Sequence, residues 1–212
     1  MTTKIKNVKT PLKIVEEVFS SLTHGLGAIF GFVGLIIGLV TLDASTAFTI
    51  SFWVYSICLV LLMTTSSLYH ALKFTGAARV FQILDHGAIF LLIVGTFTPF
   101  IVAMYSGWAM TLLLVLVWSL ASAGITLKAT LPKAMNKFGA GIYIAFGWLA
   151  ILFVPKMSSL PPNVIWLLII GGVLYTAGAI FLASKKPFMH VTWHVFVVAA
   201  ACIHYFAIIQ LP

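Results

Sequence analysis

Four ionisable side chains lie in apolar segments and have the clearest potential for chemistry in this chain. His190 and His194 form an H-x-x-x-H pair at the start of the last apolar segment. His70 closes the second segment, and Asp85 opens the third. Because ionisable groups are costly inside hydrocarbon, they are read by default as functional sites. Three imidazoles and a carboxylate at one membrane depth indicate a zinc site with a coordination position left for water.

The elements that must position these residues are membrane helices. The chain is 62% hydrophobic and only 8% charged, which excludes an ordinary soluble domain. A helix that crosses roughly 30 Å of hydrocarbon needs about 20 apolar residues, and each span must satisfy its own backbone hydrogen bonds. We therefore predict an all-α bundle of seven transmembrane helices, at about 21–42, 48–72, 80–104, 108–127, 138–155, 163–183 and 188–210. The fifth span is the shortest, and its glycines leave its boundary open.

The lysines and the arginine set the expected orientation. The N-terminal tail and the loops that follow spans two, four and six carry 11 basic residues, whereas the opposite side carries only Lys156. The positive-inside rule then places the N-terminus in the cytoplasm and the C-terminus outside. We expect a short basic tail over 1–15 and one membrane domain over 16–212, in the plasma membrane. Because the basic residues lie almost wholly on one side, we expect the net charge of +8 to set the topology and to contact anionic lipid headgroups. We do not expect it to bind nucleic acid.

This topology puts His70, Asp85, His190 and His194 in one layer near the cytoplasmic face. Residues i and i+4 share a helix face, so the last two histidines can hold one ion, and Ser66 faces the same way as His70. Asp85 is the only acid in the inner half of any predicted span. It is therefore the expected partner of metal-bound water or of a ligand imidazole.

Simpler interpretations of these residues stay open. An isolated H-x-x-x-H pair is weak evidence for a metal, Asp85 could only hydrogen-bond a histidine, and Ser66 could bond its own helix backbone. His86 points about 100° away from Asp85 and is expected to support the site or to pack. His24, near Glu16 and Glu17, is expected in an outer-shell or structural role. His204 lies too far along its helix to reach the same ion.

Several motifs together resemble a known family. They are Thr23-His24, S-x-x-x-H from Ser66, L-D-H-G from Leu84, and H-V-T-W-H-V-F-V-V-A-A-A from His190. The chain resembles the hemolysin III group of the progestin and adipoQ receptor (PAQR) family, related to alkaline ceramidases, from Glu16 to about Tyr205. One departure is Ser20, where bacterial members often have Asn before the Thr-His pair.

The resemblance implies a seven-helix bundle with zinc held by His70, His190 and His194, and with Ser66 and Asp85 lining the site. It also implies hydrolysis of a lipid amide or ester, with membrane lipid as the substrate. Two alternatives remain: a non-catalytic membrane sensor or homeostasis protein with structural zinc, and a hemolysin-type cytolysin. A secreted pore-former needs a soluble state that this composition does not offer. A proton-coupled transporter needs ionisable groups through the full depth, and the outer half has little beyond His204.

The orientation can be tested with fusions. A reporter that is active only outside the cytoplasm should be active after Pro212 and silent at Lys133, because the basic residues hold the loop at Lys133 inside. Activity should be measured in intact cells with matched expression. A C-terminal fusion that is active only in the cytoplasm would contradict the predicted depth of the histidines.

Overall fold

The structure is a computed structural model that describes residues 10–184 and 186–211, and this part of the chain contains helices and no strands. Residues 1–9 of the predicted tail, Lys185 and Pro212 lie outside the described residues. The long helices are α1 (Pro11–Thr41), α2 (Thr46–Ala71), α3 (Ala78–Met104), α4 (Gly107–Thr130), α8 (Pro162–Ala183) and α9 (Met189–Ile208). Between α4 and α8 lie the short helices α5 (Pro132–Met135), η1 (Asn136–Phe138), α6 (Gly141–Gly147), η2 (Trp148–Phe153) and α7 (Val154–Met157).

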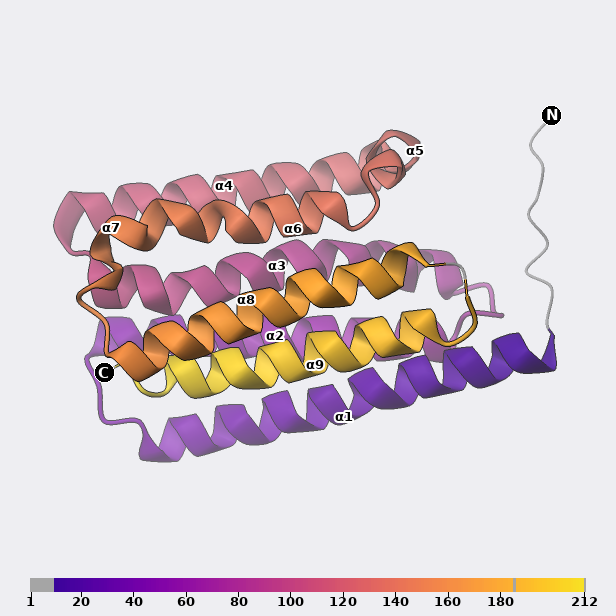
Figure 1. Cartoon of the computed structure of the whole chain (residues 1–212), viewed down its shortest axis with the longest axis horizontal. Coiled ribbons are helices and arrows are strands. Elements are labelled where there is room, and N and C mark those ends of the chain that lie inside the picture. Colours follow the sequence, from indigo (N-terminus) through magenta and orange to yellow (C-terminus); the bar gives the residue numbers. More distant parts are fainter. Residues whose placement is uncertain (1–9, 185, 212) are drawn as a thin grey trace.

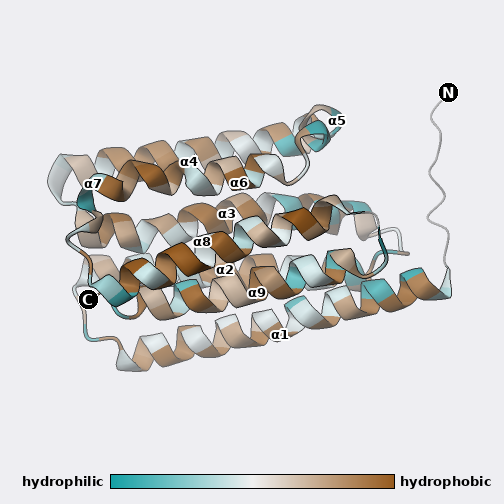
Figure 2. Cartoon of the chain, in the orientation of Figure 1, coloured by the Kyte–Doolittle hydropathy of each residue, from teal (hydrophilic) through white to brown (hydrophobic). Residues whose placement is uncertain are grey.

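The all-α membrane bundle predicted from sequence is confirmed. Among the described residues, six helices are long and apolar enough to cross a membrane, and the bent segment of α5 to α7 brings the number to as many as seven. Hydrophobic residues run along the lengths of the helices, while hydrophilic residues lie mainly toward the two ends of the bundle, at α5 and the first turns of α1 and also at α7 and the start of α8 (Figure 2). Of these spans α3 is the most buried, and it contacts α2, α4, α6 and α9.

The fifth span is broken near the glycines that left its predicted boundary undetermined. The chain bends by 72° between Pro132–Phe138 and Gly141–Met157. Gly139 adopts φ 52° and ψ −134°, a conformation that is essentially restricted to glycine. After the bend, α6, η2 and α7 run back along the bundle toward its other end (Figure 1). A 3₁₀-helix rises about 2 Å per residue instead of 1.5 Å, so the short segment reaches roughly 28 Å, close to a bilayer core.

The first helix begins ten residues earlier than predicted, at Pro11 instead of residue 21. Its start is well formed: the Thr10 side chain accepts a hydrogen bond from the Lys13 amide, and proline occupies the first helical position. The predicted start was too late because charged residues precede residue 21 and only the apolar run defined the span. The helix therefore includes Glu16 and Glu17, which lie before the start of the predicted first span.

The helix ends that carry the candidate site lie together. The start of α1, the α2–α3 connection, α5 and the α8–α9 connection all lie at one end of the bundle, and the C-terminus lies at the other (Figure 1). We call the first of these the basic end, since most of the lysines among the described residues lie there. α9 packs between α1 and α8, and also touches α3. His70 near the end of α2 and the histidines at the start of α9 therefore share one end of the molecule.

The bend at Gly139 can be tested against a neighbouring glycine. A side chain on either Gly139 or Gly141 would meet open space, but only Gly139 has a positive φ. Gly139→Ala should lower the free energy of unfolding by about 1–3 kcal/mol because of backbone strain. Gly141→Ala should leave it unchanged or slightly raised, since alanine favours helix. Thermal unfolding in detergent measures both, and equal effects would show that the strained conformation is not required.

Candidate metal centre

Three histidine side chains converge at the basic end of the bundle. His70 comes from the last turn of α2, and His190 and His194 come from the first two turns of α9. The Nε2 atom of His190 lies 3.3 Å from that of His70 and 3.1 Å from that of His194. One ligand atom from each residue lies within 4.8 Å of the others. His70 and His194 are buried, while His190 is exposed at the edge of the cluster.

The second ring nitrogens show how two of these imidazoles are protonated. The Nδ1 atom of His194 lies 3.2 Å from the backbone carbonyl oxygen of Ser20. The Nδ1 atom of His70 lies 2.6 Å from a carboxylate oxygen of Glu17. A carbonyl or carboxylate oxygen accepts hydrogen bonds, so each Nδ1 carries the proton and donates it. In the neutral rings both Nε2 atoms are therefore bare acceptors that face the centre of the cluster.

Hydrogen bonds alone do not satisfy this arrangement. His190 lies between the two bare acceptors and can offer one N–H from its Nε2 atom, which satisfies at most one of them. A cation held between the three nitrogens interacts favourably with all three lone pairs. Metal-ligating histidines usually donate their other N–H to a carboxylate or a backbone carbonyl, as His70 and His194 do here. The three histidines predicted from sequence are thus brought together in an arrangement that could hold a metal ion.

Glu17 is the functional residue that the sequence prediction missed. Asp85 was expected to be the partner of metal-bound water or of a ligand imidazole, but α1 brings a second acid to this depth, and Glu17 contacts the His70 imidazole. The signal was present: residues 17, 20 and 24 recur on one helical face. It was lost because the helix was predicted to begin at residue 21.

Glu16 ties the start of α9 to α1. Its side chain accepts a hydrogen bond of 2.5 Å from the backbone amide of Phe188, which is the N-cap residue of α9. Phe188 has φ 61°, a left-handed conformation that bulky residues rarely adopt. The helix that carries His190 and His194 is therefore fixed at its first turn by a residue adjacent to the partner of His70.

His24 packs on the cluster and lies outside the group of three histidines. Its ring stacks on that of His194 with centroids 3.8 Å apart and planes 13° apart. Neither of its nitrogens has a hydrogen-bond partner within the described residues. Ser20, whose side chain departs from the family pattern, contributes through its backbone carbonyl. A serine there keeps the hydrogen bond to His194, because this contact does not depend on the side chain.

Asp85 and Ser66 lie beside the cluster. Both are buried, and the Ser66 side chain lies close to the Asp85 carboxyl group. They line a cavity of about 400 Å³ together with His24, His190 and His194. Lys73, in the α2–α3 connection, donates a hydrogen bond to the Tyr69 hydroxyl. Burial lowers the pKa of the Lys73 ammonium, and the negative charges of Glu17 and Asp85 oppose that shift.

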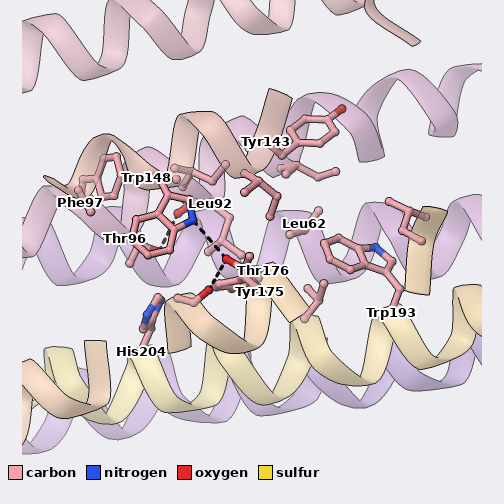
Figure 3. A pocket seen from close by; sticks show the side chains of 18 of the residues that line it. Leu62, Leu92, Thr96, Phe97, Tyr143, Trp148, Tyr175, Thr176, Trp193 and His204 are labelled. Atoms are coloured by element: carbon pink, nitrogen blue, oxygen red, sulfur yellow. Dashed lines mark hydrogen bonds between the residues drawn. The ribbon is translucent and has the colours of Figure 1, made fainter. Parts of the chain in front are cut away.

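The cavity extends from this cluster deep into the bundle. Its walls come from α2, α3, the broken fifth span, α8 and α9, with His24 added from α1, and they are largely apolar. Labelled residues of the wall include Leu62, Leu92, Phe97 and Trp193 (Figure 3). His86 lines the cavity but lies outside the group of three histidines, as predicted. His204 lies far along α9 and is also outside that group.

The fold and the site define a multi-pass helical membrane protein with a three-histidine cluster that could hold a metal ion. Comparison with known proteins gives the family. The profile described as "Haemolysin-III related" matches residues 12–205. The chain belongs to this family, the hemolysin III group of the PAQR proteins that its motifs indicated.

Similar proteins come from bacteria and animals. The chain is 36% identical over 213 residues to Hemolysin-3 of Bacillus cereus, which covers 99% of this chain and 96% of that protein. It is 35% identical over 200 residues to the Hemolysin-3 homolog of Bacillus subtilis (strain 168), covering 92% and 94%. It is also 25% identical over 236 residues to the adiponectin receptor protein of Drosophila melanogaster, covering 96% of this chain and 52% of that protein.

Metal content tests the cluster and its support together. His70→Ala should remove most bound metal, because two nitrogens bind a divalent ion weakly. Glu17→Gln should leave the three nitrogens in place but weaken affinity by about 10- to 100-fold, since the His70 imidazole loses its carboxylate partner. His204→Ala should keep its metal. Elemental analysis after titration with a competing chelator measures all three. Equal loss from the three variants would indicate a folding defect and contradict the ligand set.

Proposed function

We propose that this protein is a zinc-dependent hydrolase of an amide or ester bond in a membrane lipid, such as a ceramide-like amide. The observation that carries the proposal is the position of the Asp85–Ser66 pair. This pair lies beside three converging imidazole nitrogens, on the wall of an apolar cavity. A metal ligand set, a proton acceptor and a space for acyl chains are the components that such a reaction needs.

The donor set supports zinc. Three neutral imidazoles with no cysteine nearby suit this ion, and three protein ligands are typical of catalytic sites, which keep one position for water or substrate. His70, His190 and His194 would hold it. When bound, zinc supplies Lewis-acid activation of water and of a carbonyl group. The exposure of His190 at the edge of the cluster supports access to that remaining position.

Asp85 suits the role of general base and acid. Its carboxylate would accept a proton from the attacking water as the oxygen adds to the acyl carbon. It would then return that proton to the amine nitrogen or alcohol oxygen that leaves. The Ser66 hydroxyl lies beside this carboxyl group. It would hold Asp85 in position or donate a hydrogen bond to the oxyanion of the tetrahedral intermediate.

The cavity supports a lipid substrate. Its wall is apolar, and a segment of that wall faces outward: Trp148, Ile151 and Val154 of the broken fifth span line the cavity and are also exposed. In a membrane an exposed residue of a span faces lipid. A lipid could therefore enter sideways past this segment, with its acyl chain in the cavity and its head group at the histidines. The plasma membrane is the compartment we propose.

Names of relatives do not decide the activity. Hemolysin-3 is named for lysis, but among the described residues the apolar spans of this chain offer no soluble form for a secreted cytolysin. The structure offers a carboxylate beside a cavity that a purely structural zinc would not require. A membrane sensor with structural zinc is the alternative that the following experiment separates.

Asp85→Asn is the informative substitution. The change keeps the shape of the side chain but removes its basicity. The rate of fatty acid release from a true substrate should therefore fall by about 100- to 10,000-fold. Zinc content should stay close to that of the unmodified protein, because Glu17 and not Asp85 contacts the ligand imidazole. Glu17→Gln is the matched carboxylate control, and its main loss should be in zinc affinity. Both quantities are measured on purified protein with a panel of ceramides and related lipids in detergent.

Two results would count against this proposal. One is a zinc-loaded unmodified protein that hydrolyses no lipid of the panel, which would favour the sensor. The other is hydrolysis that survives Asp85→Asn undiminished, which would remove Asp85 from the reaction.

A further inference from the structure

The cavity holds a second group of polar atoms, remote from the histidine cluster. His204 on α9 lines it, is 7% exposed, and its ring points from α9 into the cavity (Figure 3). Its Nε2 atom lies 3.2 Å from the backbone carbonyl oxygen of Leu168. The carbonyl can only accept, so Nε2 carries the proton of the neutral ring. Nδ1 is then a bare acceptor, and it has no partner within the described part of the chain.

The ring of Tyr175 on α8 lies near the ring of His204. Its ring centroid lies 5.6 Å from that of His204, and it lines the same cavity. Side chains on a helix lean toward its N-terminus, and α8 and α9 run in opposite directions, so these two side chains approach each other. The Tyr175 hydroxyl makes no hydrogen bond with any described residue. A buried acceptor without a partner is costly, and the Tyr175 hydroxyl is a donor on the wall of the same cavity.

The other polar groups in this part of the cavity are already engaged. The Thr176 hydroxyl donates to the Gly172 carbonyl at 2.8 Å and accepts from the Trp148 indole at 3.3 Å. The Thr96 hydroxyl donates to the Leu92 carbonyl at 2.8 Å. Their hydrogen bonds leave Tyr175 and His204 as the pair that a ligand could satisfy.

The His204 ring is fixed by its neighbour on α8. A Cβ atom at Gly171 would lie 2.2 Å from the ring nitrogen Nε2, so only glycine leaves room for the ring there. The ring is held against the backbone of α8 by this close approach and by the hydrogen bond to Leu168. This is a positioned side chain and not a histidine that fills a loose space.

We propose that Tyr175 and His204 form a subsite for a hydroxyl group on the chain of an extended amphiphile. A hydroxyl is the group that can both donate to Nδ1 and accept from the tyrosine O–H. His204 follows His194 by ten residues, which corresponds to roughly 15 Å along α9. With the head group at the metal cluster, a placement that rests on the proposed function, the hydroxyl would lie well along the acyl chain. The preferred ligand is therefore a lipid with a hydroxylated acyl chain.

Oleic acid and ricinoleic acid provide a matched pair of probes. They differ by one hydroxyl, which lies beyond the middle of the ricinoleic chain. Displacement of a fluorescent fatty acid from the zinc-loaded protein in detergent gives both affinities. The unmodified protein should bind ricinoleic acid about 5- to 10-fold more tightly than oleic acid, the effect expected for one or two net hydrogen bonds. Tyr175→Phe and His204→Phe should each reduce that ratio toward one and leave oleic acid affinity unchanged.

The double variant and a remote tyrosine make the test sharper. With both partners removed, an unpaired hydroxyl is buried, so oleic acid should become the tighter ligand. Tyr205→Phe is the matched control: its hydroxyl bonds the Gly34 carbonyl at 2.9 Å outside this cavity, and its removal should leave the ratio unchanged.

Equal affinity for the two acids, a ratio that survives the double variant, or displacement by neither acid would each overturn the proposal. The readout is binding, so the result does not depend on turnover. A protein that prefers ricinoleic acid through Tyr175 and His204 but hydrolyses no lipid would keep the subsite and refute the hydrolase.

Discussion

The structure of the site depends on three imidazole lone pairs that face one another inside a membrane protein. Two of the rings are fixed as acceptors by the hydrogen bonds of their Nδ1 atoms, to Glu17 and to the Ser20 carbonyl. Their Nε2 atoms then face His190 at 3.1–3.3 Å. In a medium of low dielectric, unpaired polar atoms at such separations are costly. A bound cation removes this cost, and the helices that hold the rings can stay packed around it.

α1 is the element that makes this geometry rigid. Glu17 orients His70 of α2, Ser20 orients His194 of α9, and His24 stacks on His194 from α1 as well. Glu16 holds the first residue before α9. Two helices thus supply the three histidines that could hold a metal ion, while a third fixes the tautomers of two rings and stacks on one of them. The other buried residues of α1 are glycines, and their lack of side chains lets α1 pack closely on its neighbours. They are Gly27, Gly31, Gly34 and Gly38.

Much of this could be predicted from sequence, because a bilayer leaves few choices. Length and apolarity indicated the spans, and lysine distribution placed His70, His190 and His194 at one end before any geometry was known. Two features escaped. The charged residues in the first two turns of α1 hid Glu17, since a count of apolar residues stops at charges that a helix end tolerates beside the membrane. The break at Gly139 depends on a backbone conformation that hydropathy does not report.

The broken fifth span connects the membrane constraint to the cavity. A segment of 17 residues, Gly141–Met157, is short for a bilayer, and its 3₁₀ portion extends its reach. A 3₁₀-helix has weaker backbone hydrogen bonds than an α-helix. It is also thinner, so it offers less side-chain surface for packing against its neighbours. Trp148 holds it to α8 through one hydrogen bond of 3.3 Å to Thr176. A fully packed helix at this position would close the cavity from the side. Because this span has few residues, it forms a thin wall on one side of the cavity. A lipid could pass this wall to reach both the histidines and the proposed hydroxyl subsite.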